Sequence, residues 1–260
     1  MRRETYPTEP FHDAGHGYDL FGLEPAAVAR AVAVGAPLYE RYFRVASTGI
    51  EHVPRQGAAI LIANHSGMLP IDGWMLWHDV VRRTGRVLRP IADHFVPALP
   101  FASTRMARVG VVGGARANVR RLLDDGAVIA IFPEGVAGVA KPFRARYRLQ
   151  AWRVGHAELA IRHRAPIVPV AIVGAEESWP VAARLPIRAF GAPYLPVPWS
   201  PLPLPVRYHL RYGAPIELAR DYPAEAADDP AIVAQAAAKT RAALEVLLCD
   251  ALRARREGRS

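Results

Sequence analysis

Short apolar runs alternate with longer segments of helical periodicity after Gly49, and this alternation constrains the fold more than any other feature. We expect strands at 58–63, 87–92, 127–132, 167–173 and 206–212, and helices at 72–83, 115–125 and 149–163. Strands separated by helices of this length pair in parallel and form a sheet covered by helices on both faces. At 260 residues one such core suffices. We therefore predict a single α/β domain with a largely parallel mixed sheet, whose functional side chains gather at strand ends.

Two helices are expected to flank this alternation. Residues 25–44 repeat apolar side chains at nearly helical spacing, with Pro25 suited to the first turn. This amphipathic helix either lies on a bilayer or packs on the core, and the sequence leaves both interpretations open. Residues 229–256 begin with Asp229 as a helix cap and Pro230 behind it, which predicts a long C-terminal helix.

Two other segments lack helical periodicity. Residues 1–24 mix polar residues with glycine, and we expect a mobile N-terminal arm before the domain formed by residues 25–260. Residues 180–205 hold eight prolines among Leu, Val, Trp179 and Trp199, which excludes a helix or a central strand. This apolar loop either inserts into a membrane interface, roofs an acyl-chain groove, or covers the body with no lipid role.

The charge balance predicts an anionic partner. The formal net charge is +9, and most of the cations are arginines, whose planar fork suits phosphate. The arginines are scattered, and no zinc finger, aromatic platform or basic helix accompanies them, so we do not expect nucleic acid. The remaining candidates for the anionic partner are a membrane surface and a phosphorylated substrate.

Several features of the sequence predict a cytoplasmic protein. Its single cysteine, Cys249, excludes an internal disulfide, and no apolar run reaches the about 18 residues of a spanning helix. No export signal is visible at the N-terminus. We expect cytoplasmic localisation with peripheral association at the inner face of the membrane.

The first candidate site follows the apolar run 60–63, which ends in Asn64, His65, Ser66 and Gly67. A neutral imidazole at a strand end can take a proton from an alcohol, provided that a carboxylate fixes its tautomer. Asp72, seven residues on, is the candidate carboxylate. The pair would then resemble the base and orienting acid of a hydrolytic triad, with the substrate hydroxyl replacing the serine. The alternative is a loop histidine followed by a helix-capping aspartate.

The second candidate site ends the apolar run 129–132 with Pro133, Glu134 and Gly135. Glu134 would offer a fixed carboxylate beside a backbone that a ligand can approach closely at Gly135. Lys141 and Arg144 follow, and supply positive charge next to that carboxylate. Glu134 could bind an acceptor hydroxyl or brace a neighbouring cation. We expect these side chains, together with Asn64, to bind substrate.

These blocks resemble the glycerolipid (lysophospholipid) acyltransferase superfamily, including its monoacylglycerol-acyltransferase-like branch, over about residues 45–180. The Asn64-His65 block looks like the first family motif and 110–116 like the second. Residues 132–135 look like the third motif and 167–170 like the fourth. Four blocks in the family order are more specific than any one of them.

The resemblance implies a role for each matching residue. His65 would be the general base and Asp72 its partner, while Arg116 would bind the acceptor with Glu134 and Gly135. Two departures stand out: the usual family motif places its aspartate five residues after the histidine, where this chain has a proline. The third motif usually continues with threonine and serine, which are here valine and alanine.

The function that the resemblance implies is transfer of a fatty acyl group from an acyl thioester to a glycerolipid hydroxyl at a membrane surface. Acyl-coenzyme A or acyl carrier protein would be the co-substrate, with no resident cofactor and no metal. The sequence has no G-x-S-x-G nucleophile elbow, so no acyl-enzyme is expected. A non-catalytic lipid-binding protein on the same fold and a lipid esterase are the alternatives.

Overall fold

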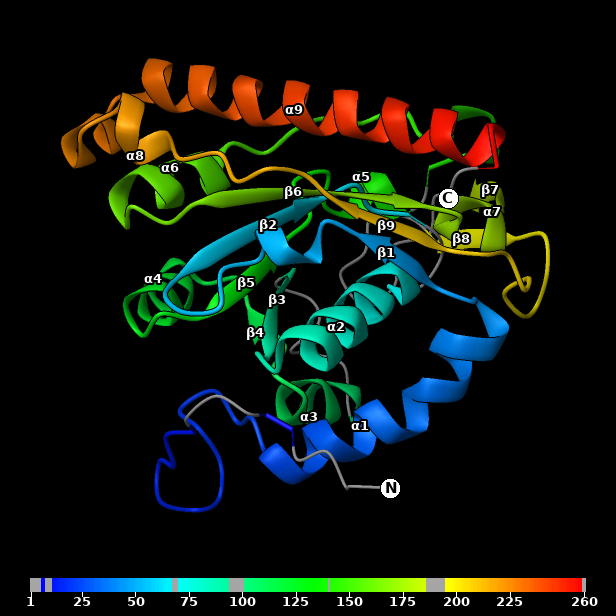
Figure 1. The fold of residues 1–260 in the computed structure, drawn as a ribbon, viewed down its shortest axis with the longest axis horizontal. Coiled ribbons are helices and arrows are strands. Elements are labelled where there is room, and N and C mark those ends of the chain that lie inside the picture. Colours follow the sequence, from blue (N-terminus) through cyan, green and yellow to red (C-terminus); the bar gives the residue numbers. More distant parts are fainter. Residues whose placement is uncertain are drawn as a thin grey trace.

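The computed structural model describes residues 6–7, 11–66, 70–93, 101–139, 141–185 and 195–258. In these residues a seven-stranded sheet has the order β1-β9-β6-β2-β5-β3-β4 (Figure 1). Its strands are β1 Ala46–Thr48, β2 Ala59–Ala63, β3 Leu88–Ala92, β4 Val112–Gly113, β5 Val128–Ile131, β6 Ile167–Val173 and β9 His209–Tyr212. Neighbouring strands pair in parallel, except that β9 runs antiparallel to β6. The predicted largely parallel mixed sheet is confirmed.

Helices cover both faces of this sheet, as expected, with α9 along one face and α1 and α2 on the other (Figure 1). The longer helices are α1 Pro25–Pro37, α2 Ile71–Thr84, α3 Ala102–Arg108, α4 Arg116–Asp124, α6 Gly155–Arg162 and α9 Pro230–Arg256. Short turns are η1 Leu38–Tyr42, η2 Ile50–His52, α5 Val136–Val139, η4 Phe143–Ala145, α7 Ala175–Ser178, α8 Leu218–Asp221 and η5 Ala224–Asp228.

The central strand β2 shows why the sheet is covered twice. All five of its residues are buried, which is typical of an apolar strand in the middle of a parallel sheet. Leu61 packs into the core on the α1 and α2 side, whereas Ile60 and Ile62 pack into the core formed with α4, α6 and α9. This alternation follows from the two-residue period of a strand, and it places the end of β2 between two packed layers.

The flanking helices form at the expected places. Asp229 caps α9, because its carboxylate accepts hydrogen bonds from the backbone N–H groups of Ala231 and Ile232 at 2.8 and 3.4 Å. The expected helix 25–44 consists of α1 followed by the π-turn η1, and Val28 and Val32 of α1 are buried in the core. The structure therefore shows this helix packed on the body.

Three expectations need correction. The expected helix 149–163 begins only at Gly155, because backbone N–H groups before it bond to the Glu134 loop: Arg153 N to Pro133 O at 3.0 Å and Gln150 N to a carboxylate oxygen of Glu134 at 2.7 Å. The expected strand 206–212 is shortened to β9. The arm 1–24 is anchored near its end, where Asp19 pairs with Arg89 at 2.5 Å.

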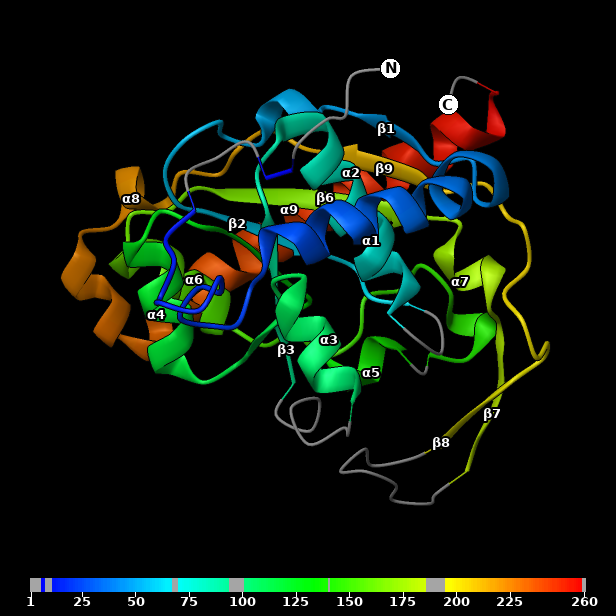
Figure 2. The same cartoon turned by 90° about the horizontal axis from the view of Figure 1, so that it is seen from below.

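The proline-rich segment 180–205 is more than a loop. Its described ends form a two-stranded antiparallel sheet, β7 Val181–Leu185 and β8 Leu195–Pro198, which projects from the body (Figure 2). Each strand of an isolated pair has a free edge, where proline is tolerated because no N–H is required. The part of the segment at 186–194 lies outside the described residues.

Candidate active site

The carboxyl end of β2 and the first turn of α2 bring His65 and Asp72 together. His65 Nδ1 lies 2.8 Å from Oδ2 of Asp72, which also accepts a hydrogen bond from the N–H of Ser66 at 2.8 Å. The other carboxylate oxygen accepts one from the N–H of Gly73 at 2.7 Å. The Asp72 side chain is buried, while 12% of the His65 side chain is exposed. The seven-residue spacing therefore closes into a contact between the two side chains. Gly67 lies outside the described residues.

An aromatic ring fixes the plane of the imidazole. Phe132 follows β5 and stacks on His65, with ring centroids 4.2 Å apart and an interplanar angle of 28°. The parallel register pairs Ile62 with Ile131, so residue 132 leaves its strand beside the end of β2. The sequence places Phe132 at a strand end and in the third family motif, and assigns it no role of its own. Its place immediately before the Pro133-Glu134 turn was the available signal.

Asn64 does not face a substrate, which corrects the expectation for this residue. It is fully buried, its amide nitrogen donates to the carbonyl oxygen of Ile172 at 2.9 Å, and its own oxygen accepts from the N–H of Ile172 at 2.8 Å. The carboxamide thus acts as one more peptide unit between β2 and β6. It fixes the strand end from which His65 projects.

Glu134 holds the backbone of His65. One of its carboxylate oxygens accepts from the N–H of His65 at 3.0 Å, and the other lies 3.3 Å from the ammonium of Lys141. Lys141 also lies 3.3 Å from Glu176, and all three side chains are buried. Glu134 and Lys141 thus form an internal brace that joins the Glu134 loop to β2 and α7, while their role in substrate binding stays a prediction.

The brace has one cation for two carboxylates. Burial raises the pKa of Glu176 to about 7, against the lowering effects of Lys141 and of the N–H of Tyr147. A buried charge pair is costly to break, since removal of one partner leaves the other uncompensated. We therefore assign Lys141 to stability of the site.

Two glycines shape the space beside His65. A Cβ on Gly138 would lie 2.9 Å from the Cβ atoms of both His65 and Glu134, so the loop can approach only without a side chain. Gly135 has φ +54°, and the guanidinium of Arg153 lies about 3 Å from where its Cβ would be. Arg153 is largely exposed and pairs with Asp93 at 3.4 Å. No motif in the sequence pointed to Arg153.

Arg116 and Arg144 lie on the surface and are not among the residues that contact His65. Arg116 begins α4 after the edge strand β4, which is three strands from β2, roughly 14 Å across the sheet. Arg144 is exposed in η4. Their roles as acceptor-binding residues stay predictions.

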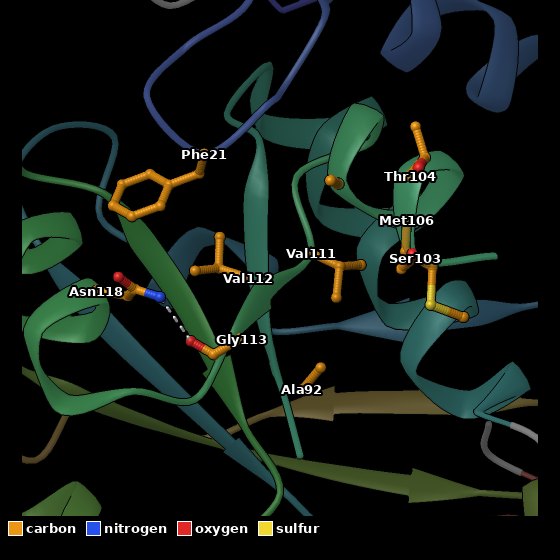
Figure 3. A pocket seen from close by; sticks show the side chains of 10 residues that line it. Phe21, Ala92, Ser103, Thr104, Met106, Val111, Val112, Gly113 and Asn118 are labelled. Carbon is orange, nitrogen blue, oxygen red and sulfur yellow. Dashed lines mark hydrogen bonds between the residues drawn. The ribbon is translucent and has the colours of Figure 1, made fainter. Parts of the chain in front are cut away.

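A cavity of about 410 Å³ opens beside the ends of β3 and β4 (Figure 3). Ala92 and Gly113 end these strands at the same sheet edge as His65, and Met106, Val111 and Phe21 add an apolar lining. The amide of Asn118 donates to the carbonyl oxygen of Gly113 at 3.2 Å, and this hydrogen bond satisfies one of the few polar groups in the cavity lining.

The fold is that of an acyltransferase. The family model described as Acyltransferase matches residues 44–173, which hold the His65 pair and the Glu134 loop, and the chain belongs to this family. The resemblance to the glycerolipid acyltransferase superfamily is thereby confirmed.

Three relatives extend this comparison. An uncharacterized protein of Mycobacterium tuberculosis is 37% identical over 258 residues, which cover 93% of this chain and 71% of that one. A protein of Bos taurus named DGAT1/2-independent enzyme synthesizing storage lipids is 28% identical over 77% of this chain and 58% of its own. The 1-acyl-sn-glycerophosphate acyltransferase PlsC of Thermotoga maritima shares the fold, with a TM-score of 0.53 at 16% identity over 82% of this chain and 78% of that chain.

In the described parts of the chain, the helices are either too short or too polar to cross a bilayer.

Proposed function

We propose that this protein transfers a fatty acyl group from an acyl thioester to the hydroxyl of a glycerolipid at a membrane surface. The observation that carries the proposal is the 2.8 Å contact between His65 Nδ1 and Asp72 at the carboxyl end of β2. Family membership supports acyl transfer, and the names of the Thermotoga and Bos taurus proteins support a glycerolipid acceptor.

The reaction follows from the geometry of the pair. With Nδ1 engaged by Asp72, Nε2 of His65 is the nitrogen that removes the acceptor proton as the oxygen attacks the thioester carbonyl. The tetrahedral intermediate collapses to the new ester, the carbon–sulfur bond breaks, and the imidazolium returns its proton to the leaving thiolate. Glu134 and Phe132 hold the base in place during both steps.

The cavity at the ends of β3 and β4 is suited to an apolar chain. Its lining is mainly apolar, and it opens on the same edge of the sheet as His65. We assign the acyl chain to it. Coenzyme A and acyl carrier protein are both compatible carriers, and the net charge of +9 favours binding at the anionic inner face of a membrane.

The test is a mass-spectrometric assay of the purified protein with acyl-coenzyme A or acyl carrier protein and a panel of lysophosphatidate, monoacylglycerol and diacylglycerol. We expect an acylated product with at least one acceptor, and a loss of about 10²–10⁴-fold in the His65→Ala variant. A variant with near-normal turnover would refute the mechanism. Free fatty acid released without any acceptor would indicate an esterase, and lipid binding without turnover would indicate a non-catalytic protein.

A further inference from the structure

Exposed apolar side chains concentrate on one segment of the surface, the proline-rich projection. Of the nine large apolar residues that are exposed in the described parts of the chain, four lie within 181–205. Trp199 and Leu202 are 68% and 70% exposed, and Leu185 and Leu204 accompany them. Such a concentration of apolar surface marks an interaction site.

Hydrogen bonds fix the backbone of this segment, so its apolar side chains stay exposed in the folded protein. The N–H of Trp199 donates to the carbonyl oxygen of Pro180 at 3.0 Å, and the indole of Trp179 donates to that of Ser200 at 2.8 Å. The hydroxyl of Tyr42 donates to the carbonyl oxygen of Pro203 at 2.5 Å. These bonds direct the backbone polar groups inward while the apolar side chains point outward.

The projection is joined to the loop that supports the catalytic histidine. The ring of Phe143 contacts that of Trp199, with centroids 5.8 Å apart, and Pro142 forms a bridge with Val181. Pro142 follows Lys141, whose ammonium pairs with Glu134. A partner that contacts Trp199 would therefore lie close to the proposed active site.

Positive charge borders the same surface. The guanidinium of Arg146 lies 4.5 Å from the Phe143 ring and also lines a cavity of about 290 Å³ with Arg255 and Arg256. Glu177 pairs with Arg255 at 2.6 Å, so the cavity lining keeps a positive excess. Arg44 also lies beside this segment, where it donates to the carbonyl oxygen of Pro205 at 2.6 Å. The C-terminal end of α9 lies at the same end of the molecule as strands β7 and β8 (Figures 1 and 2).

We infer that this end of the molecule, which we call the docking surface, binds an anionic phospholipid bilayer. It comprises Trp199, Leu202, Leu204 and the arginines that line the cavity. The indole and leucine side chains enter the interfacial layer, and the cavity receives a lipid phosphate. The inference rests on the proposed function only in taking a membrane lipid as the substrate. Apolar side chains ringed by arginines complement a bilayer with negative headgroups.

Flotation with vesicles tests the docking surface. Phosphatidylcholine vesicles with and without phosphatidylglycerol are compared for the wild type and for the double variant Trp199→Ser, Leu202→Ser. The matched control is Leu20→Ser, which removes an equally exposed leucine from the N-terminal segment. We expect the double variant to lose at least about tenfold in binding to anionic vesicles, since the lost apolar area is large, and the control to bind normally.

The arginine contribution is tested separately with Arg256→Gln. Its control is Arg55→Gln, an exposed arginine at the opposite edge of the sheet, before β2. Removal of one arginine near an anionic surface should weaken binding about fivefold, and the control should bind normally. The docking surface is wrong if the double variant binds like its control, or if the wild type binds both vesicle types equally. It is also wrong if Trp199 instead governs concentration-dependent dimerisation.

A soluble assay separates this inference from the proposed function. Transfer between a short-chain thioester and a water-soluble monoester of glycerol requires no bilayer, so all four variants should retain it. Loss of vesicle binding with retained soluble transfer supports the docking surface. If the wild type shows no transfer yet vesicle binding depends on Trp199, the proposed function fails while the docking surface stands. Thermal unfolding of the double variant and of Leu202→Ser alone checks that the surface changes leave the fold intact.

Discussion

His65 and Asp72 are seven residues apart in the sequence, yet Nδ1 of the histidine lies 2.8 Å from the carboxylate. The longer spacing therefore preserves the base-and-acid contact that the usual five-residue spacing serves in the family motif. The contact survives because Asp72 sits in the first turn of α2, where its second oxygen accepts the N–H of Gly73 and is held in place. An ionised carboxylate is also favoured near a helix N-terminus.

Replacement of Asp72 by Asn should cost activity rather than affinity. The amide cannot stabilise the imidazolium, so kcat is expected to fall by about 10²–10⁴-fold with a small change in KM. Steady-state kinetics measure both parameters. Ser66→Ala is the control, because it removes only a 3.3 Å contact to the same carboxylate and should change kcat only a few-fold. Equal losses in the two variants would contradict the role of Asp72.

Replacement of Lys141 by Met should destabilise the protein. Glu134 and Glu176 would remain buried without their shared cation, and breaking such a pair costs about 3–5 kcal/mol. Urea unfolding followed by circular dichroism measures this loss. Arg144→Gln is the matched surface change and should stay within about 0.5 kcal/mol of the wild type. If Lys141→Met kept full stability but lost acceptor affinity, the original substrate-binding interpretation would be restored.

A methyl group at Gly138 should displace the base. The new Cβ would lie 2.9 Å from that of His65, so either the loop or the histidine must move. We expect kcat to fall about ten- to a hundredfold, since small displacements of a reacting group are costly. Gly155→Ala is the control, because no atom lies within 4 Å of its added Cβ. Normal kinetics for Gly138→Ala would show that the position of His65 tolerates such movement.

His156 should make the protein less stable in acid. Burial lowers its pKa from 6.5 to about 4, while its ring contacts Thr240 at 2.7 Å and the carbonyl oxygen of Arg153 at 3.0 Å. Between pH 6.5 and 4 the unfolded histidine binds a proton that the folded one does not, so stability falls as the pH falls through this window. The loss is of the order of 3 kcal/mol.

The measurement for His156 is the unfolding free energy of the wild type and of His156→Gln across that window. The variant lacks the buried imidazole, so its stability should decline less than that of the wild type on acidification. His12→Gln, at an exposed position, should follow the wild type. If the unfolding free energies of the wild type and His156→Gln changed in parallel with pH, His156 would not contribute to the loss of stability in acid.

Much of the fold was readable because it depends on local patterns. The apolar runs at 58–63 and 167–173 predicted buried parallel strands, and the Asp229 cap predicted the start of the last helix. The segment 149–154 was misread as helix, since its N–H groups bond to a loop far away in the sequence. Periodicity carries no information about such distant partners.

The candidate site divides in the same way. The sequence alone singled out the residues to which we assign the chemistry, because a histidine, an aspartate and a glutamate beside apolar strands are recognisable from residue type and order. Only the tertiary structure decided what each of them contacts: it closed His65 onto Asp72 and turned Glu134 and Lys141 inward. The physical reason is that strand register and burial set side-chain partners across the sheet, and both arise only when distant segments pack together.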